Sequence, residues 1–146
     1  MSFEAELEDA LASAKPKLTL VPPPAVPLPV PPHFEAHRER LAKALEGGFY
    51  SMDDVLKAIA EGRAQFWPGK NAAMVTEIHT YPSETVLQVW LGAGDMEELL
   101  LMAPGIESWA RLNGCTAVIV EGRQGWSKIL KEKGYAPFSV SCKKVL

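Results

Sequence analysis

The sequence predicts an α/β domain, with a mixed sheet flanked by helices, behind an extended N-terminal arm. Its 146 residues are the length of one domain, and an apolar share of 47% is ordinary for a packed core. Eight of the twelve prolines fall between Pro16 and Pro32. Behind them, stretches with a helical spacing of apolar residues alternate with short β-like runs, as in α/β domains. We therefore divide the chain into residues 1–14, 15–32 and 33–146.

The first two segments form the arm. In residues 1–14, apolar side chains recur at helical spacing and acidic residues fill the other face, which predicts a short amphipathic helix. Residues 15–32 can form neither a helix nor a central strand, because proline lacks an N–H group and fixes φ. As polyproline II, the stretch from Pro16 to Pro32 would span about 53 Å at roughly 3.1 Å per residue. We expect this arm to be extended and to contact another protein.

The first half of the domain predicts two helices and three strands. Residues 33–46 have apolar side chains at helical spacing and end at Gly47-Gly48, a typical helix stop. Ser51 is the expected N-cap of a second helix that ends at Gly62. Runs of alternating or β-branched residues then predict strands at residues 64–68, 72–80 and 85–91. Pro82-Ser83 is the expected turn between the second and third strands.

The second half of the domain predicts helices and strands in alternation. A helical region covers residues 95–113, and Pro104-Gly105 inside it predicts a kink or a restart. A buried strand follows at residues 115–120, then a helix at 124–133 and a last strand at 137–145. Because a helix connects residues 85–91 with residues 115–120, these two strands are expected to be parallel neighbours.

This order of elements resembles the GNAT acetyltransferase fold. The resemblance is most detailed in the segment "EGRQGWSKILKEKGY". Gly134-Tyr135 stands where the family has a Gly-Phe pair, which places Leu130 at the family's tyrosine and Arg123 at its asparagine. The resemblance implies that this tyrosine is the general acid toward the CoA thiolate and that the asparagine binds the pantetheine arm. Leucine has no proton to donate, and an arginine is bulkier and charged.

The stretch that corresponds to the family's pyrophosphate loop is "LGAGDMEELL". Such a loop binds phosphate through free backbone N–H groups at a helix start. Gly92 and Gly94 permit a tight turn here, but no Arg or Gln leads the loop, and Asp95 is expected to cap the helix itself. Further acidic residues, Glu97 and Glu98, would repel a diphosphate. We therefore expect a degenerate cofactor site, with no cofactor bound; the alternative is acetyl-CoA held through backbone contacts alone.

Three further segments resemble small GNAT-like proteins of tailed bacteriophages and prophages: "FYSMDDVLKAI", "FWPGKNAAMVTEI" and "GCTAVIVEGRQGW". The resemblance implies a non-enzymatic structural or assembly protein of the virion, assembled in the cytoplasm of the bacterial host. Its arm would dock on phage head or tail proteins. The alternative is a divergent acetyl-CoA-dependent N-acetyltransferase in the cytoplasm. The expected partner contacts of the arm are its apolar side chains: Phe3, Leu7, Leu11, Val21, Val26, Leu28 and Val30.

Composition and spacing exclude several other classes of protein. No stretch approaches the roughly 20 apolar residues that span a bilayer, and the acidic start is unlike a signal peptide, so we expect a soluble protein without membrane partners. A net charge of -3 argues against a general nucleic-acid binder, although residues 121–146 are basic and leave a local contact open. Cys115 and Cys142 are expected to be reduced and buried.

Two pairs of polar residues are candidates for a metal site or a catalytic site. His33 and His37 can share a helix face, but a catalytic zinc site needs a third protein ligand and none is evident. Glu77 and His79 share a strand face. The resemblance to GNAT proteins implies that a glutamate in the cleft can act as a general base, yet exposed polar residues on strands are commoner. The four tryptophans are expected to be core or half-buried packing residues: Trp67, Trp90, Trp109 and Trp126.

Overall fold

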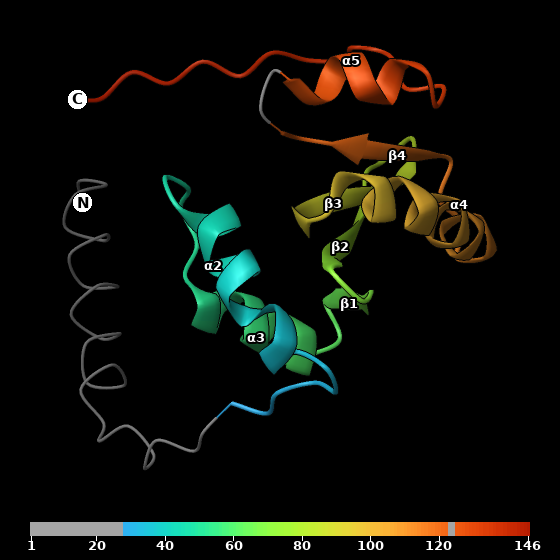
Figure 1. Ribbon diagram of the computed structural model, residues 1–146. Helices are drawn as coiled ribbons and strands as arrows, with labels where there is room; N and C mark the ends of the chain where they lie inside the picture. The colour runs from blue at the N-terminus through green and yellow to red at the C-terminus, as the bar shows by residue number, and fades with distance from the viewer. Residues whose placement is uncertain (1–27, 123–124) are drawn as a thin grey trace, which may run out of the picture.

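The sheet of this protein has four strands in the order β1-β2-β3-β4, with helices on both faces (Figure 1). The computed structural model describes residues 28–122 and 125–146. Antiparallel pairing joins β1 (Ala64–Pro68) to β2 (Ala72–Thr80) and β2 to β3 (Thr85–Gly94). Parallel pairing joins β3 to β4 (Ala117–Val120). The prediction of parallel neighbours at residues 85–91 and 115–120 is thereby confirmed.

A register shift in β3 divides the sheet between two cores. Val75 pairs with Leu91 and Thr76 pairs with Val89, so β3 contains Trp90 as an extra residue. Such a bulge changes the face to which the following side chains point. Before it, Leu87 packs in the cluster under α4; after it, Leu91 packs in the cluster under α2 and α3. The four tryptophans are half-buried against these clusters, as predicted.

On the first face, the second helix begins where the sequence predicts it, whereas the first begins later than residue 33, because His33 lies in a turn with φ +67°. A 3-10 turn, η1 (Glu35–His37), leads into α2 (Arg38–Leu45), and α3 (Met52–Ala60) follows. The Ser51 hydroxyl accepts from Asp54 N, and the Asp54 carboxylate accepts from Ser51 N, which together make a capping box. Val55 and Leu56 are buried against the sheet.

The helix on the second face, α4 (Met96–Leu112), continues through Pro104. The expected restart at Pro104-Gly105 is therefore wrong. Proline removes one intrahelical hydrogen bond, but buried side chains on both sides of it, Leu99 and Ile106, are packed against the same part of the sheet. Tertiary packing thus holds the helix as one unit. No helix among the described residues has the length and apolar content to cross a membrane.

The C-terminal segment departs most from the prediction. After α5 (Gly125–Lys131) the chain forms no strand, so the strand predicted at residues 137–145 is wrong. A β-like pattern forms a strand only beside another strand that pairs with its backbone, and residues 132–146 run past the sheet without one (Figure 1). Their side chains are largely exposed, including Cys142, which was expected to be buried. β4 is also shorter and more exposed than the buried strand expected at residues 115–120.

The described end of the arm lies on the domain. Leu28 is half-buried against the core cluster of α2 and α3, and Phe34 N donates a hydrogen bond to Pro31 O. Val30 is 42% exposed. The predicted helix at residues 1–14 and most of the proline-rich segment lie outside the described residues. With them lie the predicted partner contacts Phe3, Leu7, Leu11, Val21 and Val26.

Candidate functional site

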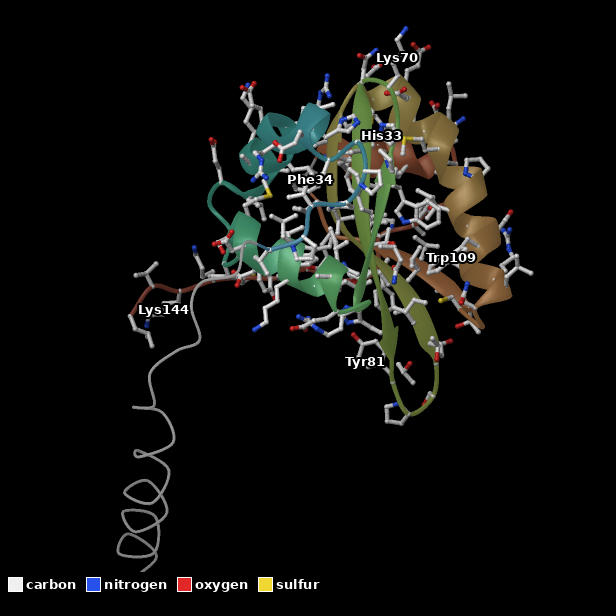
Figure 2. The ribbon with its side chains drawn as sticks, turned by 90° about the horizontal axis from the view of Figure 1, so that it is seen from below. His33, Phe34, Lys70, Tyr81, Trp109 and Lys144 are labelled. Atoms are coloured by element: carbon white, nitrogen blue, oxygen red, sulfur yellow. The ribbon has the colours of Figure 1, made fainter. Side chains whose placement is uncertain are left out.

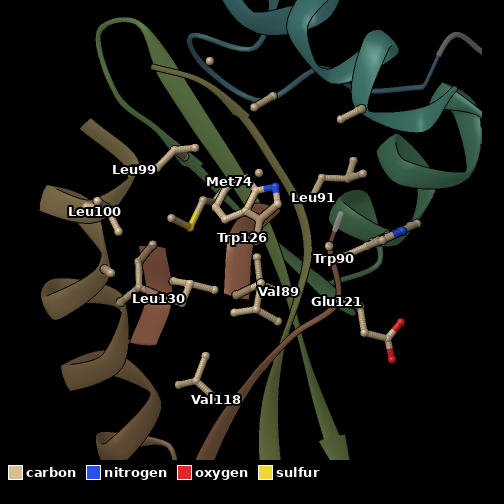
Figure 3. A pocket seen from close by; sticks show the side chains of 18 of the residues that line it. Met74, Val89, Trp90, Leu91, Leu99, Leu100, Val118, Glu121, Trp126 and Leu130 are labelled. Carbon is tan, nitrogen blue, oxygen red and sulfur yellow. The ribbon is translucent and has the colours of Figure 1, made fainter. Parts of the chain in front are cut away.

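The candidate site is the cleft where β3 and β4 separate. Their pairing ends at Val89 and Val120, whereas β3 continues to Gly94 beside β2. A cavity of about 510 Å³ lies at this divergence, between the strands, α2, α4 and α5 (Figure 3). Most of its wall is apolar, with Met74, Leu99 and Val118 among the lining side chains. The charged side chains at its border are two cations and two carboxylates: Arg40, Lys43, Glu107 and Glu121.

The first four residues of the stretch that corresponds to the phosphate loop are the end of β3, and the stretch continues into α4. Gly92 pairs with Met74 and Gly94 pairs with Ala72, so both glycines belong to the ladder between β2 and β3. The tight turn that Gly92 and Gly94 would permit is therefore not formed. Gly94 has φ +102°, and a Cβ there would overlap Asn71 O and lie 2.7 Å from the Ala72 Cα. Glycine is therefore needed at position 94 for the close approach of the chain's own backbone.

The start of α4 is occupied by the chain's own acidic residues. Asp95 caps the helix, as predicted, because its carboxylate accepts from Glu97 N at 3.3 Å. The Glu98 carboxylate accepts from Lys70 N at 2.8 Å and from Asn71 N at 2.7 Å. Glu98 therefore holds the loop between β1 and β2 against α4. Sequence reasoning assigned this residue a repulsive role and missed the loop, because the two segments are far apart in the chain.

Trp126 fills the opening between the two strands. A Cβ on Gly122 would lie 3.1 Å from Trp126 Cδ1, and a Cβ on Gly92 would lie 3.7 Å from Trp126 Cη2. The indole is thus packed between two backbones that have no side chains at these positions. Leu130, one helical turn further along α5, adds to the apolar wall (Figure 3). Arg123, expected at the position of the family's asparagine, lies outside the described residues.

These residues do not fit the diphosphate end of acetyl-CoA. A diphosphate needs open N–H groups and favours a positive helix end, whereas Asp95 and Glu98 place carboxylates on this end of α4. The Trp126 indole also stands between the strands. Tyr135, which the sequence analysis placed only at the position of the family's phenylalanine, lines the cavity. Burial and the nearby Glu107 carboxylate raise the pKa of its phenol, so the group keeps its proton at neutral pH.

The other polar candidates form contacts with their own neighbours. His37 is buried; its Nε2 lies 2.9 Å from Gly69 O and its Nδ1 lies 2.9 Å from Arg40 Nη1, which fits a ring that carries its proton on Nε2. Across residues 28–122 and 125–146, no three potential metal ligands come together. His79 Nε2 and Glu77 Oε2 lie 3.3 Å apart, and neither side chain lines the cavity.

Known proteins resemble this chain in structure only. The sequence matches no protein-family model, and no curated protein is significantly similar to it. TTHA1254 from Thermus thermophilus is 18% identical, with a TM-score of 0.55 over 79% of this chain and 95% of that one. An acetyltransferase from Trypanosoma brucei is 16% identical, with a TM-score of 0.54 over 77% and 92% of the two chains. Glucosamine-6-phosphate N-acetyltransferase from Arabidopsis thaliana is 10% identical, with a TM-score of 0.52 over 75% and 92%.

Similarities at such low identity concern the arrangement of helices and strands. They agree with the fold that the order of elements predicts. The described residues have the mixed sheet, the parallel pair β3–β4 and the helices that this arrangement requires. The chain therefore has a GNAT-like acetyltransferase fold.

Proposed function

We propose that this chain is a non-enzymatic GNAT-like protein that acts by binding other proteins. The proposal rests on one observation: residues Gly92–Glu98, which correspond to the cofactor loop, make contacts with other parts of the same chain. Gly94 lies against Asn71, Asp95 caps α4, and Glu98 holds the loop between β1 and β2. Trp126 adds a second obstacle, because its indole packs between Gly92 and Gly122.

The finer proposal is a structural or assembly protein of a bacteriophage virion, assembled in the cytoplasm of the bacterial host. The resemblance of three sequence segments to phage and prophage proteins supports it, and so does the proline-rich arm. A proline-rich chain is already restricted and loses less conformational entropy on docking. The arm would contact phage head or tail proteins through its apolar residues, with Phe3, Leu7 and Leu11 anchoring a helix in a partner's groove.

Isothermal titration calorimetry with acetyl-CoA tests the loss of the cofactor site. We expect no binding heat from the purified full-length chain in the micromolar range, and desulfo-CoA serves as a matched ligand without the thiol. An active acetyltransferase under the same conditions is the positive control. Circular dichroism establishes that the titrated protein is folded. Micromolar affinity for acetyl-CoA would overturn the proposal.

Truncation tests the arm. Residues 1–27 are removed and Leu28 is kept, because Leu28 packs on the domain core. We expect an almost unchanged melting temperature and loss of the protein from particles purified from its host. Replacing Phe3, Leu7 and Leu11 with alanine should have the same effect, whereas Glu6→Gln, on the other face of the predicted helix, should not. Full incorporation of the truncated chain would contradict docking through the arm.

A divergent acetyltransferase is the second candidate, and Tyr135 is the observation that favours it. Its phenol lines the cavity and keeps its proton at neutral pH, so it has a proton to donate where Leu130 has none. Two of the structurally similar proteins are acetyltransferases by name. If acetyl-CoA binds in the titration, slower release of CoA by Tyr135→Phe would identify Tyr135 as the general acid. Unchanged binding of acetyl-CoA by the same variant would show that the tyrosine acts in the reaction and not in cofactor binding.

A further inference from the structure

Charge is unevenly distributed along this chain. Residues 121–146 contain six lysine or arginine residues and two glutamates, which gives this end a net charge of +4. Because the whole chain has a net charge of -3, residues 1–120 have a net charge of -7. An asymmetry of this kind indicates that one part of a chain contacts an anionic partner such as nucleic acid. The basic end is therefore a candidate for such a contact.

The lysines of the basic end are exposed and have no carboxylate partner. Trp126 and Leu130 of α5 line the cavity, so Lys128 and Lys131 lie on the outer side of the same helix. Five lysines are exposed, and within residues 28–122 and 125–146 none of them forms an ion pair: Lys128, Lys131, Lys133, Lys143 and Lys144. Each is available to an external anion, and lysine binds phosphate well as a point charge.

Aromatic rings lie exposed beside these lysines. Lys143 Nζ lies 5.6 Å from the centre of the Phe49 ring, which brings the C-terminal segment to the connection between α2 and α3. Phe49 is 84% exposed and Phe138 is 82% exposed. Tyr50 is also exposed, and its ring packs edge-on against Trp90 with 4.9 Å between the centroids, which holds it in place. Exposed rings of this size can stack with a further planar group.

The C-terminal segment connects the lysines of α5 with these rings. It runs from α5 toward the side of the domain on which α2 and α3 lie, with Lys144 at its far end (Figures 1 and 2). None of the five lysines and three exposed rings lines the cavity between β3 and β4. We call these eight side chains the basic-aromatic surface: Phe49, Tyr50, Lys128, Lys131, Lys133, Phe138, Lys143 and Lys144.

We propose that the basic-aromatic surface binds single-stranded nucleic acid. Its lysines pair with phosphates and its rings stack on bases, which is the combination by which proteins bind single strands without sequence preference. A single strand is favoured over a duplex because its bases are free to reach the rings. The acidic remainder of the chain repels phosphates elsewhere and confines the nucleic acid to this end. The surface includes neither the cavity nor residues 1–27, so this proposal can fail independently of the proposed function.

The rings favour nucleic acid over an acidic protein as the partner. An acidic segment would pair with the same lysines, but carboxylate side chains do not stack on aromatic rings. Three exposed carboxylates, Glu46, Asp53 and Glu132, are close to the surface in the sequence and oppose the binding of any anion. The five lysines outnumber them, so the attraction is local and moderate.

Fluorescence anisotropy of a labelled oligothymidylate, titrated with the full-length chain, tests the binding. A length of about 20 nucleotides exceeds the roughly 4–16 nucleotides that a compact single-strand site covers. We expect a dissociation constant between about 10⁻⁶ and 10⁻⁴ M near physiological salt. A duplex of the same length should bind more weakly, because its bases are paired and stacked on one another. No binding in this range, or equal binding of the duplex, would overturn the proposal.

The salt dependence of the affinity tests the lysines. Each lysine that pairs with a phosphate of a single strand adds about 0.7 to the fall of log K with log salt concentration, so Lys143→Gln/Lys144→Gln should reduce this slope by about 1.4. Lys70→Gln is the control, since Lys70 is exposed and lies on the opposite side of the domain from Lys144 (Figure 2). An unchanged slope in the double variant, or an equal reduction in Lys70→Gln, would refute the surface.

Substitutions of Phe49 test the stacking. Phe49→Leu keeps an apolar side chain without the ring, and the loss of stacking on one base should weaken binding about 5- to 150-fold. Phe49→Tyr is the matched control, which keeps a ring and should bind as the wild type does. Because Phe49 is largely exposed, all three chains should have the same circular dichroism spectrum and melting temperature. Equal affinities of Phe49→Leu and the wild type would contradict stacking and overturn the proposal.

Competition with other polyanions identifies the class of partner. Unlabelled oligothymidylate should displace the labelled one, whereas polyglutamate and phosphatidylserine vesicles at the same concentration of charge should displace it far less. Equal displacement by polyglutamate would indicate a surface for acidic proteins, and equal displacement by vesicles a surface for lipid; either result would overturn the proposal. Glu132→Gln should strengthen binding, most of all at low salt, because it removes an opposing charge that salt screens. Unchanged affinity at low salt would contradict a surface that includes Lys131 and Lys133.

Discussion

Gly94→Ala measures how closely the end of β3 is packed against its own chain. Gly94 has φ +102°, a conformation that other residues adopt at a cost of about 1–3 kcal/mol. The new Cβ would also overlap Asn71 O and approach the Ala72 Cα to 2.7 Å. Backbone atoms cannot rotate away as a flexible side chain does. Overpacking of this kind costs about 1–3 kcal/mol.

The two contributions together predict a loss of about 2–6 kcal/mol, a large part of the roughly 5–15 kcal/mol that stabilises a typical domain. Two other glycines provide matched controls. Gly62 has φ +75° with no atom near its Cβ position, so Gly62→Ala should lose only about 1–2 kcal/mol from its backbone conformation. Gly105 lies inside α4 with open space around it, and Gly105→Ala should gain about 0.5–1 kcal/mol.

Urea denaturation at 25 °C, followed by tryptophan fluorescence and by far-UV circular dichroism, gives the three changes in the free energy of unfolding. Coincident transitions from the two probes establish two-state behaviour. The decisive comparison is between Gly94→Ala and Gly62→Ala. If the first loses no more than the second, Asn71 does not lie against Gly94. The end of β3 would then be an open loop, and the cofactor site would have to be reconsidered.

Three other predictions test single contacts. The buried Thr76 hydroxyl accepts a hydrogen bond from the Trp67 indole N–H at 2.9 Å. Because valine leaves this N–H without a partner, Thr76→Val should lower the free energy of unfolding by about 1–3 kcal/mol in the same assay; a neutral result would contradict this contact. Hydrogen bonds from Ser51 lower the pKa of Asp54 below its usual 3.8. The resulting stability is present above that pH and is lost as the pH falls through the folded-state pKa. The free energy of unfolding of Asp54→Asn should therefore be lower than that of the wild type at neutral pH, and the two values should converge in acid. A difference that stays constant with pH would argue against the cap. Cys142 should react quickly with Ellman's reagent and Cys115 slowly, because burial shields the second thiol and raises its pKa; equal rates would refute the burial of Cys115.

Short-range patterns were enough to predict most helices and strands of the domain. Ser51 and Asp54 stand at the spacing of a capping box, and Pro82-Ser83 lies between two strand-like runs, so each signal depends on neighbours in the chain. The parallel pairing of β3 and β4 followed from one general rule on crossover connections. The acidic N-cap Asp95 and the apolar Leu130 were also evident from the residues alone.

Contacts between distant segments decided the rest, because no local pattern encodes them. The Glu98 carboxylate accepts from Asn71 N, 27 residues earlier in the chain. Pairing with β2 places Gly92 and Gly94, in the stretch that resembles a phosphate loop, in a strand. Trp126 lies between the ends of β3 and β4 only because Gly92 and Gly122 come together around its indole. Residues 137–145 have the alternation of a strand, yet a strand needs a partner for its N–H and C=O groups, and within the described chain none is placed beside them. Local sequence sets what a segment can form, and the backbone that lies next to it decides whether it does.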